Sequence, residues 1–223
     1  MLNFLRLIRQ IFFKSINKNF YSQFGEDKVL NELIKKNHKN GFYVDVGCYH
    51  PKKHSNTYNL YNQKKWNGIN IDIEEDKIKA FKVLRPNDVN ICCPISNKKR
   101  NIKVFKEQSF GLKSRIINSK KIDNQTKETK KLNDIIDNSK FKNRKIDLLN
   151  IDTEGNDFDV LKSLDIKKYE PKIILVESHK KDIKEILNSK IYKYLKKNKY
   201  KLRSWNFFTL IYVKNNSKIL VQR

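Results

Sequence analysis

Glycine, proline, cysteine and arginine are all scarce in this chain of 223 residues. None of the six glycines forms the GxGxxG loop with which dinucleotide-binding domains hold a pyrophosphate. The three cysteines, Cys48, Cys92 and Cys93, show neither a CxxC pair nor a Cys/His spacing typical of zinc. An odd number of cysteines, two of them adjacent, also shows no disulfide framework, so we expect a reducing, cytoplasmic location.

The positive charge of the chain is carried almost entirely by lysine. A formal net charge of +25 suggests a nucleic-acid or anionic-membrane partner. Only eight of the 49 basic residues are arginine, however, and arginine is the preferred residue for bidentate contacts to phosphates and bases. The lysines are spread along the chain together with abundant asparagine and isoleucine, as codon drift in an AT-rich genome would produce. We therefore favour composition drift over a nucleic-acid partner.

Long hydrophobic runs are absent as well. No segment approaches the roughly 20 apolar residues of a membrane span. Residues 1–20 mix apolar and basic side chains without a small-residue cleavage site, so we interpret them as a basic amphipathic helix and not as a signal peptide. Such a helix packs on its own domain or on a second subunit, or it makes peripheral contact with an anionic membrane.

The rest of the chain alternates apolar runs with amphipathic windows, which is typical of a parallel α/β sheet. Strands are expected over residues 42–46, 69–73, 89–95, 146–151 and 173–176, followed by an antiparallel pair over 200–205 and 207–213. Helices are expected over 26–36, 55–66, 77–84, 131–137, 158–164 and 182–197, with a short strand at 102–105 and an insertion loop over 109–130. The pattern predicts a doubly wound sheet of about seven strands, mostly parallel, with a terminal antiparallel strand.

Two acids follow the first two strands, where open sheets of this kind bind their ligands. Asp45 and Gly47 end the first strand, and Asp72 ends the second. Glycine lets the backbone approach a ligand closely, and an acid at the second strand end is placed for ribose hydroxyls. Because phosphate-binding glycines are missing, the pair favours an adenosine-type ligand without phosphate, a description that S-adenosylmethionine fits.

A second group of polar residues follows the later strands. Asp152 and Glu154 are two residues apart, so strand alternation puts them on the same side. They could orient an acceptor hydroxyl, act as a base or hold a divalent cation, although their spacing alone does not indicate a metal. His50, beside the glycine turn, and His179, after the fifth parallel strand, are alternative bases because imidazole exchanges protons near neutral pH.

Several segments, taken together in order and spacing, resemble the FkbM family of methyltransferases. They are Tyr21-Ser22-Gln23-Phe24-Gly25-Glu26-Asp27, residues 42–51, Ser55-Asn56-Thr57, residues 66–72 and residues 146–155. The resemblance covers residues 21–213 and implies a class I fold, S-adenosylmethionine as donor and O-methylation. Acceptors in the family are polyketide-type small molecules or sugars of surface glycans.

The resemblance also implies roles for individual residues. The Ser-Gln-x-Gly-Glu-Asp segment should form a lid over the donor. The donor pocket should contain Gln23, Glu26, Asp45, Gly47, Tyr49, Asp72 and Ile73, with Ser96 facing adenine. Ile73 departs from the proline found in many relatives, which should leave the ribose contact of Asp72 intact.

The domain layout that follows is a basic helix over 1–20, a methyltransferase domain over 21–214 and a tail over 215–223. Two alternatives stay open at this point. One is an RNA methyltransferase, or another nucleic-acid-binding protein, that uses the basic surface. The other is a membrane-associated scaffold that has kept the fold and lost the chemistry.

Overall fold

The computed structural model describes residues 5, 20–104, 125–215, 217 and 220. Apart from residues 5 and 20, the segment expected to form the N-terminal helix lies outside the described residues, as does most of the expected insertion loop. Within the described part of the chain, no helix is long and apolar enough to cross a membrane.

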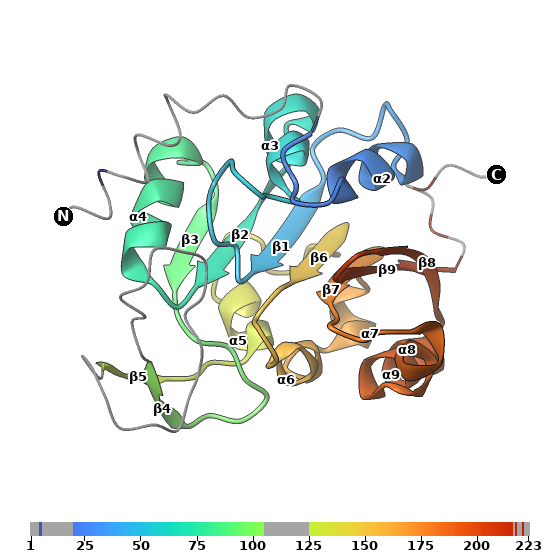
Figure 1. Cartoon of the computed structure of the whole chain (residues 1–223). Coiled ribbons are helices and arrows are strands. Elements are labelled where there is room, and N and C mark those ends of the chain that lie inside the picture. Colours follow the sequence, from blue (N-terminus) through green and yellow to red (C-terminus); the bar gives the residue numbers. More distant parts are fainter. Residues whose placement is uncertain (1–4, 6–19, 105–124, 216, 218–219, 221–223) are drawn as a thin grey trace.

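Seven strands form one sheet in the order β3-β2-β1-β6-β7-β9-β8 (Figure 1). The strands are β1 Phe42–Val46, β2 Asn67–Asp72, β3 Val89–Cys92, β6 Leu148–Ile151, β7 Ile173–Glu177, β8 Tyr200–Asn206 and β9 Thr209–Lys214. All neighbouring pairs are parallel except those made by β9, which runs antiparallel to both β7 and β8. The predicted sheet, mostly parallel with a terminal antiparallel strand, is confirmed.

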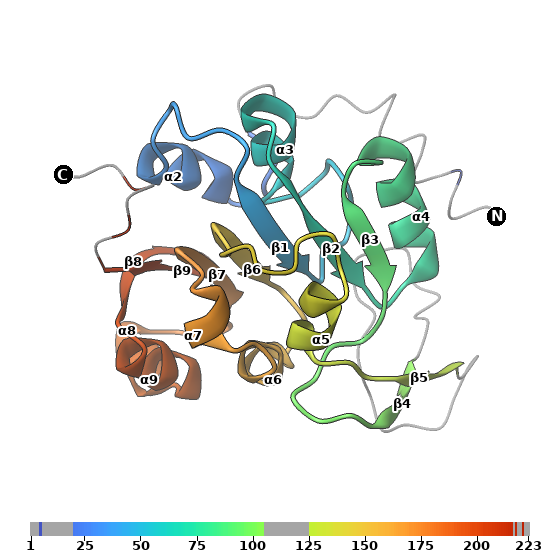
Figure 2. The same ribbon diagram turned by 180° about the vertical axis from the view of Figure 1, so that it is seen from behind.

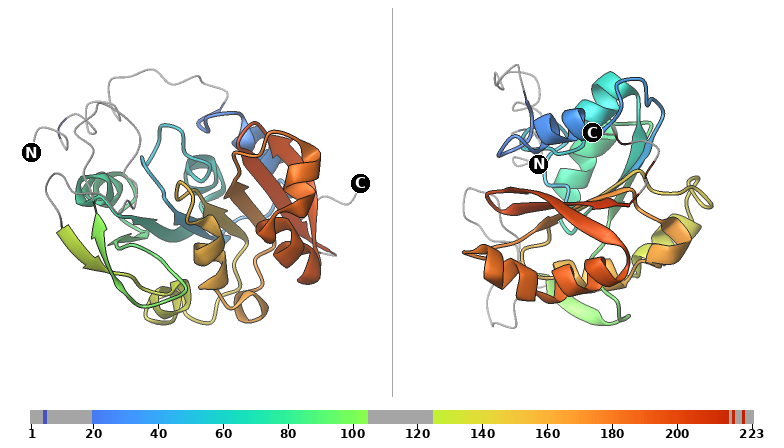
Figure 3. Two further views of the ribbon diagram at one scale, coloured as in Figure 1. Left: turned by 60° about the horizontal axis from the view of Figure 1, so that its bottom comes forward. Right: turned by 90° about the vertical axis from the view of Figure 1, so that its right-hand side faces the viewer.

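Helices cover both faces of this sheet, as the side view in Figure 3 shows. One face carries α2 Glu26–Leu33, α3 Tyr58–Lys64 and α4 Glu75–Leu84, and the other carries α5 Leu132–Asp137, α6 Asp157–Lys162, α7 Ile166–Tyr169, α8 Ile183–Asn188 and α9 Lys190–Lys197. Alternate residues of β1 supply both cores: Tyr43 packs in the cluster with Trp66, while Phe42 and Val44 belong to the larger cluster on the opposite face. Because both faces are covered, the central strands β1, β6 and β7 are almost wholly buried, and their ends are left to form a site.

Two local expectations are wrong. The helix expected over 182–197 is broken at Ser189, whose extended backbone has ψ 152° and whose side chain accepts a hydrogen bond from the Tyr192 amide. Serine competes with the helix by capping the next turn, and the apolar periodicity does not register this. The expected loop contains β5 Gln125–Glu128, which pairs with β4 Asn101–Val104 in a ribbon outside the main sheet (Figure 2). Its sequence, Gln-Thr-Lys-Glu, has no apolar residue that could have indicated a strand.

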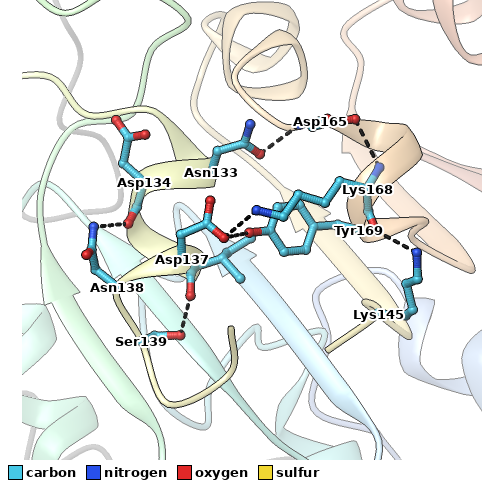
Figure 4. A network of polar contacts seen from close by, with 10 residues as sticks. Asn133, Asp134, Asp137, Asn138, Ser139, Lys145, Asp165, Lys168 and Tyr169 are labelled. Carbon is cyan, nitrogen blue, oxygen red and sulfur yellow. Dashed lines mark hydrogen bonds and ion pairs between the residues drawn. The ribbon is translucent and has the colours of Figure 1, made fainter. Parts of the chain in front are cut away.

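A polar network joins α5 to α7 on one face of the sheet (Figure 4). One carboxylate oxygen of Asp137 accepts from the Lys168 ammonium and from the Tyr169 hydroxyl, each at 2.5 Å. Burial and the hydrogen bond to Asp137 raise the pKa of Tyr169 to about 12. An ion pair with an exposed lysine contributes little to stability. The hydrogen bond from the buried Tyr169 is therefore the main link between the two helices.

Candidate active site

A cavity of about 420 Å³ opens at the carboxyl ends of β1, β2, β6 and β7. From β1 the chain runs outward through β2 and β3, and β6 then starts the other half of the sheet on the far side of β1. The cavity therefore lies at the topological switch point, where doubly wound sheets bind ligands. Its two sides differ in chemistry.

Asp72 ends β2 on the first side and is held by the backbone around it. One carboxylate oxygen accepts from the Tyr49 amide at 3.1 Å, and the other accepts from the Glu74 amide at 2.9 Å. The Lys77 ammonium lies 3.8 Å away. Burial raises the pKa of the Asp72 carboxyl, and Lys77 and the two amides oppose that rise. The carboxylate is thus fixed in direction, and it lines the cavity.

Asp45 belongs to β1 and has both carboxylate oxygens satisfied by side chains. The Thr57 hydroxyl donates to one at 2.7 Å, and the Asn150 amide donates to the other at 2.8 Å. Asn150 in turn accepts from Asn56 at 3.0 Å. Burial raises the pKa of Asp45, while these hydrogen bonds lower it. Thr57 and Asn150 thus orient Asp45 where it borders the cavity.

Arg85 is fully buried behind this wall and ties the 51–57 loop together. Its guanidinium donates to the Pro51 carbonyl, to the Ser55 hydroxyl at 2.8 Å and to the Thr57 hydroxyl at 2.8 Å. Since Thr57 donates onward to Asp45, Arg85 supports Asp45 through one intermediate side chain. A buried arginine is costly to desolvate and is retained where all its donors are used.

Gly47 makes the turn after β1 with φ of +77°. A Cβ built there would lie 1.7 Å from the Asp152 carbonyl oxygen, so no other residue fits without moving backbone. The glycine therefore allows the loops that follow β1 and β6 to meet at the cavity floor. This is the close approach that a glycine at a strand end permits.

The second side of the cavity is acidic. Asp152 and Glu177 share a hydrogen bond. Although Asp152 is exposed toward the cavity, desolvation of its carboxyl, followed by the charge of Glu177, raises the pKa of Asp152 well above its ordinary range. Nε2 of His179 lies 3.0 Å from a Glu177 carboxylate oxygen and 4.0 Å from a Glu154 oxygen. Glu154, Glu177 and His179 each offer one ligand atom within 4.8 Å of the others, so this corner could hold a metal ion.

The segment before α2 closes one end of the cavity. Gln23, Phe24 and Glu26 all line it. Glu26 is 2% exposed, and its carboxylate accepts from the Phe24 amide at 2.9 Å and from the Thr209 hydroxyl at 2.8 Å. The segment is thereby attached to the start of β9, although the two are far apart in the sequence.

Most of the residues predicted from the sequence meet here. The cavity is lined by Gln23, Glu26, Asp45, Gly47, Tyr49, Asp72, Ile73, Asp152 and Glu154. His50 and Ser96 are not brought into it. The His50 ring is buried, with Nδ1 accepting from the Lys52 and Lys53 amides, and the buried Ser96 hydroxyl accepts from the Lys98 amide.

Sequence reasoning missed three contributors. Arg85 lies outside every motif, and no local signal distinguishes it from a surface arginine. Phe208 lines the cavity from the turn before β9, at the far end of the chain. Lys77, which faces Asp72, could have been found from the helical spacing after the strand-end acid.

Comparison with known proteins agrees with this geometry. The family described as "Methyltransferase FkbM domain" matches residues 45–202, which is most of the chain. The chain belongs to the FkbM methyltransferase family. The FkbM match spans both sides of the cavity, from Asp45 through Glu177. No curated protein and no solved structure gives a significant match.

Proposed function

We propose that this FkbM methyltransferase uses S-adenosylmethionine to methylate a hydroxyl oxygen of a sugar or of another small molecule. The observation that carries the donor assignment is the charge of the cavity. Six carboxyl groups line it, against one lysine among the described residues, in a chain whose net charge is +25. Such a pocket suits a cationic ligand and disfavours the phosphates of a dinucleotide.

The first side of the cavity suits the donor. Asp72 is fixed by the Tyr49 and Glu74 amides and fits ribose hydroxyls. Asp45, braced by Thr57 and Asn150, fits the amino group of the methionine part. Gln23 and Glu26 line the cavity from the segment before α2, in keeping with a lid.

The second side suits proton removal from the acceptor. Bound S-adenosylmethionine supplies a methyl group that is already activated by its positively charged sulfur. The protein must align the acceptor hydroxyl within about 3–3.5 Å and accept its proton. The raised pKa of Asp152 makes its ionised form the stronger base, with Glu154 two residues away. His50 is a weaker candidate because it does not line the cavity.

Calorimetric titration with S-adenosylhomocysteine, followed by turnover of two variants, tests this function. We expect binding to the wild type, to Asp152→Asn and to Glu154→Gln. Turnover should fall about 100-fold or more in Asp152→Asn, as for loss of a general base. A folded wild-type protein that does not bind S-adenosylhomocysteine would refute the donor assignment, and unchanged turnover in both variants would refute the carboxylate base.

A further inference from the structure

The mouth of the cavity carries an aromatic rim whose rings have solvent-exposed faces. Phe207 is 72% exposed and Phe208 45% exposed, both in the turn between β8 and β9. The Phe24 ring stacks on Phe207 at 5.0 Å between centroids and meets Phe208 edge-on at 5.6 Å. Phe24 and Phe208 also line the cavity, so the rim is continuous with it.

The rim is held in place by contacts on both sides. Glu26 accepts from the Phe24 amide and from the Thr209 hydroxyl, which fixes the segment before α2 against the turn. The His179 ring lies 5.1 Å from Phe208, between the aromatic rim and the carboxylates. The rings are therefore positioned before any ligand arrives, so binding orders few side chains.

The adjoining wall carries carboxylates and one imidazole, because Glu177 pairs with Thr209, the residue after Phe208. Asp152, Glu154 and Glu177 gather around His179 at the ends of β6 and β7. Carboxylates accept hydrogen bonds from hydroxyl groups and repel other anions at short range. A ligand that contacts both walls thus meets an apolar ring surface next to the carboxylates of Glu154 and Glu177.

We infer that these two walls form the acceptor subsite, and that it selects an uncharged hydroxylated ring over an anionic one. This inference rests on the proposed methyltransferase function. The C–H face of a neutral sugar ring packs on Phe208 and Phe24, while its hydroxyls donate to Glu154 and Glu177. A uronate or sugar phosphate in the same place brings its anion against those carboxylates.

The test uses the full chain saturated with S-adenosylhomocysteine and a panel of methyl glycosides. The panel contains neutral hexosides and deoxyhexosides, the matching uronic acids and the matching sugar phosphates. Saturation-transfer NMR reports binding, and release of S-adenosylhomocysteine from S-adenosylmethionine reports turnover. We expect neutral glycosides to bind and their anionic counterparts not to bind.

Single substitutions test the aromatic wall and the acidic wall one at a time. Phe208→Ala should raise the KM for a neutral glycoside about five- to tenfold, the range for loss of one aromatic contact, with S-adenosylhomocysteine affinity unchanged. Glu177→Gln should admit the matching uronate, which a purely structural role of Glu177 would not do. Leu187→Ala is the control, because it removes an exposed apolar side chain that does not line the cavity. It should change neither the KM for the neutral glycoside nor the exclusion of the uronate.

The outcomes distinguish this inference from the proposed function. Anionic sugars binding as well as neutral ones, or no glycoside binding to a protein that binds S-adenosylhomocysteine, would overturn the inference alone. An unchanged KM in Phe208→Ala would show that the aromatic wall does not contact the acceptor. Failure to bind S-adenosylhomocysteine would overturn the proposed function.

Discussion

Individual carboxylates give this site its character, and their hydrogen bonds assign them different tasks. The Asp72 carboxylate accepts hydrogen bonds from two backbone amides and has Lys77 beside it. The main chain therefore sets its orientation. Asp152 shares a hydrogen bond with Glu177 and has other acids around it, so its ionised form is disfavoured. Identical side chains are thus suited to different tasks, and in the proposed function Asp72 binds the donor while Asp152 acts as the base.

Asp72→Asn should weaken binding of S-adenosylhomocysteine about 10- to 100-fold, because a hydrogen bond to a charged acceptor contributes about 1.5–3 kcal/mol. The exchange keeps the shape of the side chain, so the protein should fold normally. Glu75→Gln is the control, since Glu75 lies one turn away on the exposed face of α4. Calorimetry measures both variants, and equal affinities would contradict the role of Asp72.

Asp152→Asn should stabilise the protein at neutral and alkaline pH. The pKa of Asp152 is raised on folding, so the folded state holds its proton to higher pH than the unfolded chain. The contribution of Asp152 to stability therefore falls as pH rises from the unfolded pKa toward the folded one. The Tm of the variant minus that of the wild type should grow in thermal unfolding scans as the pH rises above about 4, the ordinary pKa of an aspartate. A constant difference would mean that Asp152 ionises as freely as in the unfolded chain.

At the scale of elements, the site depends on how closely the strand ends approach each other. The turns after β1 and β6 touch at Gly47 and the Asp152 carbonyl. The 51–57 loop is fixed to the end of α4 through Arg85. The start of β9 is bound to the segment before α2 through Glu26 and Thr209. Each junction joins segments far apart in the sequence, so loosening one should open the cavity without unfolding the sheet.

Gly47→Ala should destabilise the protein by about 3 kcal/mol or more, because overpacking is added to the strain of a positive φ. Gly155→Ala provides the comparison. Gly155 also has a positive φ, of +103°, but nothing lies within 4 Å of the added Cβ, so strain alone should cost about 1–2 kcal/mol. Denaturant unfolding gives both values. Equal losses would mean that the turns after β1 and β6 can separate at little cost.

Over the whole molecule, charge is distributed unevenly. The chain carries +25, yet its cavity is lined by six carboxyl groups. Exposed lysines attract polyanions at long range, and this attraction is screened by salt. The acids in the cavity act over a few ångströms on whatever enters. Non-specific attraction to nucleic acid and selection of the reacting group are therefore separate properties.

Binding of random RNA should be detectable at about 50 mM salt and lost by about 300 mM, because counterion release dominates such contacts. Over the same range the affinity for S-adenosylhomocysteine should hardly change. Filter binding measures the affinity for RNA, and calorimetry measures the affinity for S-adenosylhomocysteine. Transfer of labelled methyl groups to RNA, or RNA affinity that persists in high salt, would instead favour the RNA methyltransferase alternative.

The sequence by itself determined which segments form the seven-stranded sheet and which residues follow its strands. Apolar runs report burial, so the β1 strand was predicted with its observed bounds, 42–46. Strand ends of a parallel sheet converge by geometry, so the sequence alone places Asp45, Asp72, Asp152 and Glu154 at one cavity. The family resemblance added Gln23 and Glu26, which no periodicity indicates.

Only the tertiary structure decided how these groups are paired and which candidates stay outside. Strand β5 was not predicted because its four residues are all polar and it forms only by pairing with β4. His50 follows the cavity residue Tyr49 in the sequence, but its ring accepts hydrogen bonds from the Lys52 and Lys53 amides and does not line the cavity. Arg85 and Phe208 reach the site through packing between distant segments. Local sequence fixes where a strand ends, whereas the direction of a side chain depends on the neighbours that folding brings to it.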